Sequence, residues 1–112
     1  EGWGLPQMEA MACGIPLISV HDYHVRDELY GDVAYMVDPL PPDLWSTWHT
    51  GARLLAIDPM AIAKAIDRMV GSEELRNRIR DKGLERTAQF KWADTQAAMI
   101  QKVKELYARS SG

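Results

Sequence analysis

The sequence predicts a helix-rich α/β fold with about two parallel strands, and three observations support this prediction. Two short apolar runs without helical periodicity, at residues 16–20 and 33–37, are typical of buried parallel strands. A short helix is expected before each run, and three amphipathic helices are expected after them, an alternation typical of α/β architecture. Because two strands do not make an independent doubly wound sheet, we expect the remaining strands to lie upstream of Glu1.

The first two predicted helices are short and are bounded by proline and glycine. Pro6 suits a first helical turn, where a missing N–H costs nothing, and Gly14 suits the position just past a helix end. These two residues predict a helix at residues 6–13. A second short helix is expected at residues 25–30, closed by Gly31 before the second strand.

The second half of the chain divides into an irregular insertion and a helical end. Residues 40–57 mix prolines, a glycine and aromatic side chains without any period. Residues 58–108 are predicted to form three closing helices, which start after Asp58, at Ser72 and near Trp92. Their apolar faces consist of Ile62, Ile66, Met69 and Val70 in the first, Leu75, Ile79 and Leu84 in the second, and Trp92, Met99, Val103 and Leu106 in the third.

Composition and charge argue against several classes of function. The 112 residues match one domain or a piece of one, and 46% hydrophobic content is ordinary for a globular protein. A net charge of −3 and a pI near 5.5 argue against a nucleic-acid partner, because nucleic-acid binders present a basic face. The single cysteine, Cys13, is expected to be a small buried residue in a reducing compartment. No apolar run approaches the ~20 residues that span a bilayer, and no leader is seen, which favours a cytoplasmic protein.

The chain opens with a glycine-flanked turn, EGWGL, that leads directly into the first helix. Gly2 and Gly4 let a ligand approach the main chain without meeting a side chain, and the first turn of a helix leaves backbone N–H groups unpaired. Glu1 and Glu9 lie on either side of this turn. Together these features predict a cradle for an anion or a sugar.

The stretch EGWGLPQMEAMACGIPLIS resembles the signature of retaining GT-B glycosyltransferases of the group 1 type. That family's pattern is a Glu, seven residues and a second Glu, within E-G-F-G-L-P-x-x-E-A-M-A-x-G-x-P-V-I, and Trp3 here replaces the Phe. The run GDVAYMVDP is similar to the family's G-x-A-x-x-V-x-P strand, and the segment from DPMAIAKAI to GLERTAQFKWADT resembles its closing helices. The resemblance covers nearly all of the chain except residues 40–57.

The resemblance implies that the chain is the C-terminal part of a Rossmann-like, nucleotide-sugar-binding domain, with the acceptor-binding domain upstream. It implies transfer of a sugar from a nucleotide-diphosphate sugar to a sugar, lipid or other acceptor, with retention of anomeric configuration and no metal or other cofactor. The isolated fragment is expected to be inactive. The full-length enzyme is expected in the cytoplasm or at the periphery of a membrane.

The resemblance also implies roles for residues of the opening turn. Glu1 is the implied catalytic residue beside the donor sugar, and Glu9 is implied to accept hydrogen bonds from the nucleotide ribose. A carboxylate can take two ribose hydroxyls at once, and amides at a helix start stabilise charge on a departing diphosphate. The implied donor-binding residues are Gly2, Trp3, Gly4, Leu5 and Glu9.

Alternatives to this function stay open. The enzymatic alternatives are a sugar-nucleotide epimerase or a phosphorylase of GT-B fold. The alternative of another class is a non-catalytic helical module that self-associates through uncovered apolar faces and strand edges. His21, His24 and His49 match no compact metal site, and residues 76–82 are typical of a solvated helix face.

Two segments invite a choice between structural and binding roles. Trp45 and Trp48 either stack on an acceptor sugar or pin the insertion to the surface, and we favour the second role. The acceptor-side loop departs from the family pattern, because HDYH replaces a Gly-rich stretch and Asp27 replaces the Pro that precedes Glu28.

Overall fold

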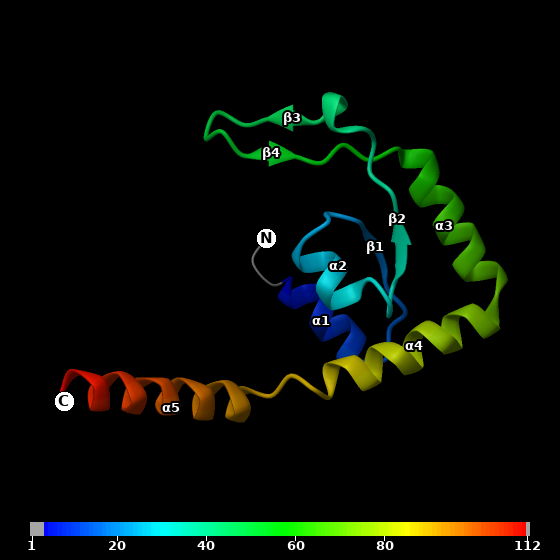
Figure 1. The fold of residues 1–112 in the computed structure, drawn as a ribbon. Helices are drawn as coiled ribbons and strands as arrows, with labels where there is room; N and C mark the ends of the chain where they lie inside the picture. Colours follow the sequence, from blue (N-terminus) through cyan, green and yellow to red (C-terminus); the bar gives the residue numbers. More distant parts are fainter. Residues whose placement is uncertain (1–3, 112) are drawn as a thin grey trace.

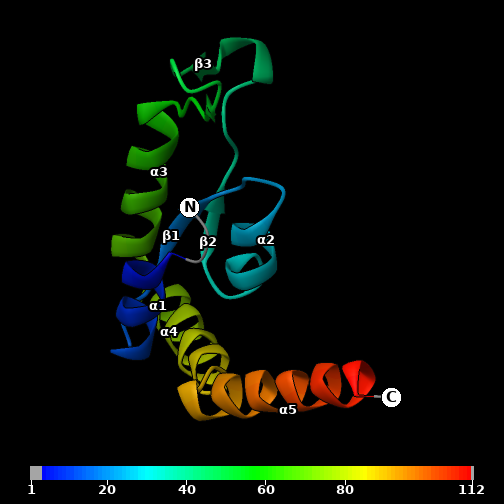
Figure 2. The same cartoon turned by 90° about the vertical axis from the view of Figure 1, so that its left-hand side faces the viewer.

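A computed structural model describes residues 4–111, which form an elongated molecule of 60 × 39 × 17 Å (Figure 1). Its mixed α/β character agrees with the prediction from the sequence. A small sheet lies between α2 on one side and α3 on the other, and α4 runs beneath it (Figure 2). The described elements, in chain order, are α1 (Leu5–Ala12), β1 (Ile18–Val20), α2 (Val25–Tyr30), β2 (Tyr35–Val37), the 3-10 turn η1 (Pro42–Leu44), β3 (Ser46–Thr47), β4 (Arg53–Leu54), α3 (Pro59–Gly71), α4 (Glu73–Thr87) and α5 (Trp92–Ser110).

The predicted pair of parallel strands is confirmed, although both strands are shorter than expected. Strands β1 and β2 pair in parallel, with Val20 opposite Val37. Strand β2 starts only at residue 35, because the N–H groups of Val33 and Ala34 bond back to the Tyr30 carbonyl at 3.0 and 2.9 Å. These two residues therefore close α2 instead of joining the sheet.

The predicted helix boundaries are confirmed to within one or two residues, and the capping bonds explain them. Gly14 adopts φ +77°, and its N–H bonds the Met11 carbonyl at 2.9 Å, which ends α1 in the left-handed turn that glycine favours. The Asp58 carboxylate accepts the Met60 N–H at 2.9 Å at the start of α3. At the start of α4 the Ser72 hydroxyl accepts the Leu75 N–H at 3.1 Å.

The core lies where α1, α2 and the start of β2 meet. Its buried members are Met8, Met11, Leu29, Tyr30 and Val33. Tyr30 is fully buried, and its hydroxyl donates to the Gly4 carbonyl at 3.1 Å, which ties the end of α2 to the start of α1. Helix α4 closes this core from below, because Gly83 leaves room for the Met11 side chain, which lies 3.6 Å from where a Cβ would be.

Residues 40–57, predicted to be an irregular insertion, contain a short hairpin that the prediction missed. Strands β3 and β4 pair antiparallel within this segment, with Ser46 opposite Leu54. The turn between them is closed by bonds from the Trp48 N–H to the Ala52 carbonyl at 2.9 Å and from the Gly51 N–H to the Trp48 carbonyl at 2.8 Å. Gly51 permits this turn because it adopts φ +84°.

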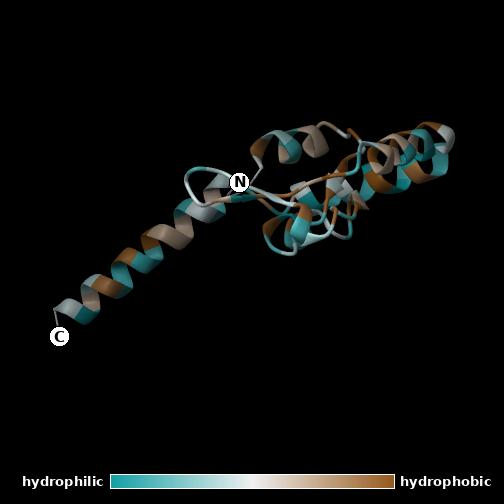
Figure 3. Ribbon diagram, turned by 90° about the horizontal axis from the view of Figure 1, so that it is seen from above, coloured by the Kyte–Doolittle hydropathy of each residue, from teal (hydrophilic) through white to brown (hydrophobic). Residues whose placement is uncertain are grey.

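The closing helices have the predicted apolar periodicity but bury little of it. Met69 of α3 and Ile79 of α4 are buried, whereas Val70 remains 72% exposed. Helix α5 projects away from the rest of the molecule, with hydrophobic and hydrophilic residues alternating along it (Figure 3). The predicted apolar periodicity of α5 is present, but the face it forms is not buried. Its members Trp92, Met99, Val103 and Leu106 are all exposed.

Candidate functional site

The first turn of α1 is built around Gly4, one of the predicted donor-binding residues. Gly4 is buried and adopts φ +77° and ψ +54°, a conformation that L side chains rarely take. Its carbonyl accepts the N–H groups of Gln7 and Met8, at 3.1 and 3.2 Å, as well as the Tyr30 hydroxyl. Because Pro6 has no N–H, the described main-chain donors left for an anion at this turn are those of Gly4 and Leu5.

Helix α1 presents one exposed face and one buried face. Met8 and Met11 point into the core, and Leu5 and Glu9 lie on the exposed side one turn apart. Within residues 4–111 no ion pair engages the Glu9 carboxylate. The structure thus places Gly4 and Leu5 at the start of α1 and Glu9 one turn further along the same exposed face, with its carboxylate accessible to a ligand.

Three of the predicted site residues lie outside the described part of the chain. They are the predicted catalytic residue Glu1 and the predicted donor-binding residues Gly2 and Trp3.

Helix α1 runs against the direction of β1 and β2, so its first turn points toward the end at which both strands finish (Figure 1). Ligands of open parallel sheets bind outside that carboxyl end.

The loop after β1 forms a network around Asp27 that the sequence analysis did not anticipate. Its carboxylate bonds the His21 Nδ1 and accepts the N–H groups of Asp22 and Tyr23. Partial burial raises the pKa of Asp27, but the hydrogen bonds from His21, Tyr23 and Asp22 outweigh that effect and hold the pKa below its ordinary value of 3.8. The only signal in the sequence is that Asp27 stands where the glycosyltransferase pattern that the sequence resembles has a Pro.

The two tryptophans of the insertion differ in their surroundings. Trp45 donates from its Nε1 to the Leu40 carbonyl at 2.7 Å, and the Arg53 guanidinium lies 5.0 Å from the centre of its ring system. Trp45 therefore has a structural role inside the insertion, since both partners lie within residues 40–57, and the prediction that it pins the insertion to the surface stays a prediction. Trp48 is 57% exposed and stacks on His49, with ring centroids 5.9 Å apart. The choice for Trp48 stays open.

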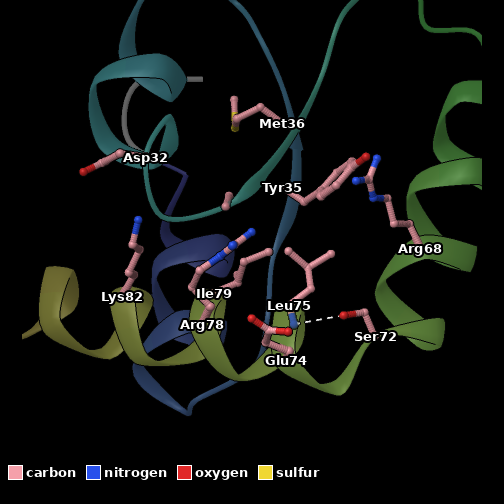
Figure 4. A pocket seen from close by; sticks show the side chains of 11 residues that line it. Asp32, Tyr35, Met36, Arg68, Ser72, Glu74, Leu75, Arg78, Ile79 and Lys82 are labelled. Carbon is pink, nitrogen blue, oxygen red and sulfur yellow. Dashed lines mark hydrogen bonds between the residues drawn. The ribbon is translucent and has the colours of Figure 1, made fainter.

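A cavity of about 480 Å³ opens between β2, α3 and α4 (Figure 4). Arg78 and Lys82 rise from α4 along it, and Asp32 and Glu74 add opposite charges. Its charges are mixed, which is typical of a solvated groove and gives no selectivity for one kind of ion. Its lining residues are Asp32, Ala34, Tyr35, Met36, Arg68, Ser72, Glu74, Leu75, Arg78, Ile79 and Lys82.

The solvated face predicted for residues 76–82 is confirmed only in part. Arg78, Arg80 and Lys82 are exposed as expected. Arg76 differs, because its guanidinium donates to the carbonyls of Met69 and Val70 at 2.7 and 2.6 Å and thereby satisfies the end of α3.

Arg86 is a structural residue that the sequence analysis missed. Its guanidinium donates to both carboxylate oxygens of Asp32, at 2.7 and 2.8 Å, and to the Leu29 carbonyl at 2.8 Å. It therefore clamps α4 to the end of α2, across 54 residues of sequence in the case of Asp32. Sequence spacing offers no signal for a contact over such a separation.

Cysteine and metal chemistry gain no further support from the structure. Cys13 is exposed, so the expectation that it is buried is wrong, because it caps α1 on the solvent side. Among residues 4–111 no three His, Cys, Asp or Glu side chains gather as a metal site would require. In the same part of the chain, every helix is too short or too polar to cross a bilayer.

Comparison of the chain with models of protein families, with curated proteins and with solved structures gave no match.

Proposed function

We propose that this chain forms the C-terminal part of the donor-binding domain of a retaining glycosyltransferase that uses a nucleotide-diphosphate sugar. The observation that carries the proposal is the exposed face of α1, on which Glu9 lies one turn beyond Leu5, the residue that follows the left-handed Gly4 at the helix start. The glycosyltransferase pattern of a Glu, seven residues and a second Glu requires that the second carboxylate be free to accept hydrogen bonds from the ribose hydroxyls. The placement of Glu9 meets this requirement. Rossmann-like topology and a cytoplasmic or membrane-peripheral location belong to the same proposal.

The chemistry proposed for the turn follows from its main chain. Cleavage of the bond between sugar and diphosphate builds negative charge on the leaving group and positive charge on the anomeric carbon. Amides of Leu5 and of the residues before it are offered to the diphosphate, since the next N–H groups of α1 are bonded to the Gly4 carbonyl. Glu1 remains the proposed catalytic residue, and its role is to orient the donor sugar and favour the positive charge.

The proposal is tested on the intact enzyme, by which we mean this chain with the upstream residues that the proposed domain requires. Radiolabelled nucleotide-diphosphate sugars are incubated with a panel of acceptors, and the anomeric configuration of the product is read by NMR. The expected result is a glycoside with the configuration of the donor. Release of an epimer of the sugar nucleotide, or phosphorolysis without transfer, would contradict the proposal and favour the epimerase or the phosphorylase.

The self-associating helical module remains a second candidate, because a specific observation favours it. The apolar face of α5 is exposed along its whole length, with Trp92 at 82% and Met99 at 65% exposure. Light scattering after size exclusion distinguishes the two candidates. A monodisperse monomer would remove self-association through α5.

A further inference from the structure

Two of the three ring side chains in the loop between β1 and α2, those of His21 and Tyr23, stack on each other at the carboxyl end of the sheet. The backbone N–H of His21 donates to the Val37 carbonyl at 3.0 Å, so His21 continues the pairing of the strands by one residue. Asp38 follows β2 directly, and its carboxylate lies 3.9 Å from the His21 Nε2. Both residues therefore stand at the edge toward which the first turn of α1 also points (Figure 1).

One carboxylate, that of Asp27, binds both the His21 ring and the Tyr23 backbone. Asp27 binds the His21 ring through Nδ1, which leaves Nε2 on the outer side facing Asp38. The same carboxylate accepts the Tyr23 N–H and holds this residue at φ +61°, a left-handed conformation that is unusual for tyrosine. The two rings stack with their centroids 6.0 Å apart and their planes 11° apart.

The fold alone does not account for this arrangement. Asp27 explains how the loop closes, but the Tyr23 side chain is 64% exposed and adds little to the core. A tyrosine in a left-handed conformation has a strained backbone, and such strain is concentrated at functional sites. The Tyr23 ring stacks on the His21 ring, which Asp27 binds, and this contact favours one orientation of the tyrosine before a ligand arrives.

We propose that Tyr23 and His21 form a subsite for a sugar ring, an inference that rests on the proposed function and deepens it. The C–H face of a pyranose is apolar and lies flat against an aromatic ring, while its hydroxyl groups need polar partners at the rim. Tyr23 supplies the face, and the His21 Nε2 with the Asp38 carboxylate supplies the hydrogen bonds. The ring bound there belongs to the donor or to the acceptor, and the experiment distinguishes these two sources.

The test compares Tyr23→Gly with Tyr23→Phe in the intact enzyme. Glycine removes the ring and also relieves the left-handed backbone, so this variant is expected to fold at least as well as the wild type. Phenylalanine keeps the stacking face and serves as the matched control. We expect Tyr23→Gly to weaken sugar recognition about three- to tenfold and Tyr23→Phe to change it less than twofold.

The source of the ring follows from which constant changes. If Tyr23→Gly raises the Kd for the nucleotide-diphosphate sugar but leaves the Kd for the sugar-free nucleotide diphosphate unchanged, the subsite belongs to the donor. A higher KM for the acceptor alone assigns it to the acceptor. Both constants unchanged in Tyr23→Gly would overturn the subsite.

A second measurement keeps the inference separate from the proposed function. Ring resonances of Tyr23 and His21 are followed by NMR while D-glucose, D-galactose, D-mannose and N-acetyl-D-glucosamine are added to the wild-type protein. Movement of these resonances with at least one sugar is expected even if the protein binds no nucleotide, in which case only the glycosyltransferase proposal fails. Static resonances with all four sugars would contradict the subsite itself.

Discussion

Helices α1 and α5 have similar apolar stripes, but α1 buries its stripe and α5 exposes it. Helix α1 buries Met8 and Met11 against α2 and α4, whereas α5 exposes Val103 to 65% and Leu106 to 54%. The difference does not come from the stripe, since both helices repeat apolar residues at helical spacing. It comes from the partners, because α1 meets the fully buried Tyr30 and the small Gly83. An apolar stripe therefore indicates which face of a helix would gain from burial. Whether that face is buried depends on the tertiary contacts that the rest of the chain provides.

The largest expected effect comes from comparing two tyrosines, Tyr30 in the core and Tyr107 on α5. Tyr30→Ala removes a fully buried ring and its bond to the Gly4 carbonyl, and we expect a loss of about 3–5 kcal/mol in the free energy of unfolding. Tyr107→Ala removes a ring that is 73% exposed, and we expect a change below about 0.5 kcal/mol. Urea unfolding followed by circular dichroism measures both. Equal losses in the two variants would show that α5 is packed in solution.

The clamp between α4 and α2 gives the next largest effect. Arg86→Met keeps most of the aliphatic stem but removes the bonds to Asp32 and to the Leu29 carbonyl. We expect a loss of about 1–2 kcal/mol, at the lower end because Asp32 is largely exposed. The exposed Arg78 provides the control, and Arg78→Met is expected to leave the unfolding midpoint almost unchanged. A loss in Arg78→Met as large as that in Arg86→Met would refute the clamp.

The loop after β1 predicts a pH dependence of stability. Because the pKa of Asp27 is lowered in the folded protein, its contribution is complete above the unfolded-state pKa of about 4 and is lost as the pH falls through the folded-state pKa. Asp27→Asn is therefore expected to cost about 1 kcal/mol at pH 7 and to show a shallower decline in stability below pH 4. Thermal unfolding across this range measures the difference, and parallel pH profiles for the two proteins would count against the network.

The smallest effect is expected on α5. Val103→Ser and Met99→Ser should change the free energy of unfolding by less than about 0.5 kcal/mol, since both side chains are already exposed. Reduced self-association of these variants in light scattering would indicate instead that a second copy covers this face. Hydrogen exchange of the α5 amides provides an independent check, with rapid exchange expected if the helix lacks tertiary support.

Local signals predicted much of the fold, and long-range contacts supplied the rest. Pro6, Gly14 and Ser72 placed helix ends to within one or two residues because capping depends on adjacent backbone groups. The β3–β4 hairpin escaped prediction because its strands have two residues each, too few to show a period of two. Cys13 was misplaced because neighbouring small residues do not reveal which side of a helix is covered.

The candidate site divides in the same way. The position of Glu9 on an exposed helical face follows from its spacing relative to Met8 and Met11, so the sequence contained that information. The Asp27 network did not follow from any spacing rule, because it depends on how the loop folds back over a short helix.

The central claim is that Glu9 binds the ribose of a nucleotide-diphosphate sugar, and isothermal titration calorimetry of the intact enzyme tests it most directly. Glu9→Gln removes the charge but keeps the size of an exposed side chain, so the unfolding temperature should not change. Loss of charge-assisted hydrogen bonds is expected to cost about 1.5–3 kcal/mol, which is about a 10- to 150-fold increase in the Kd of the nucleotide-diphosphate sugar. Equal Kd values for the wild type and Glu9→Gln would contradict the account.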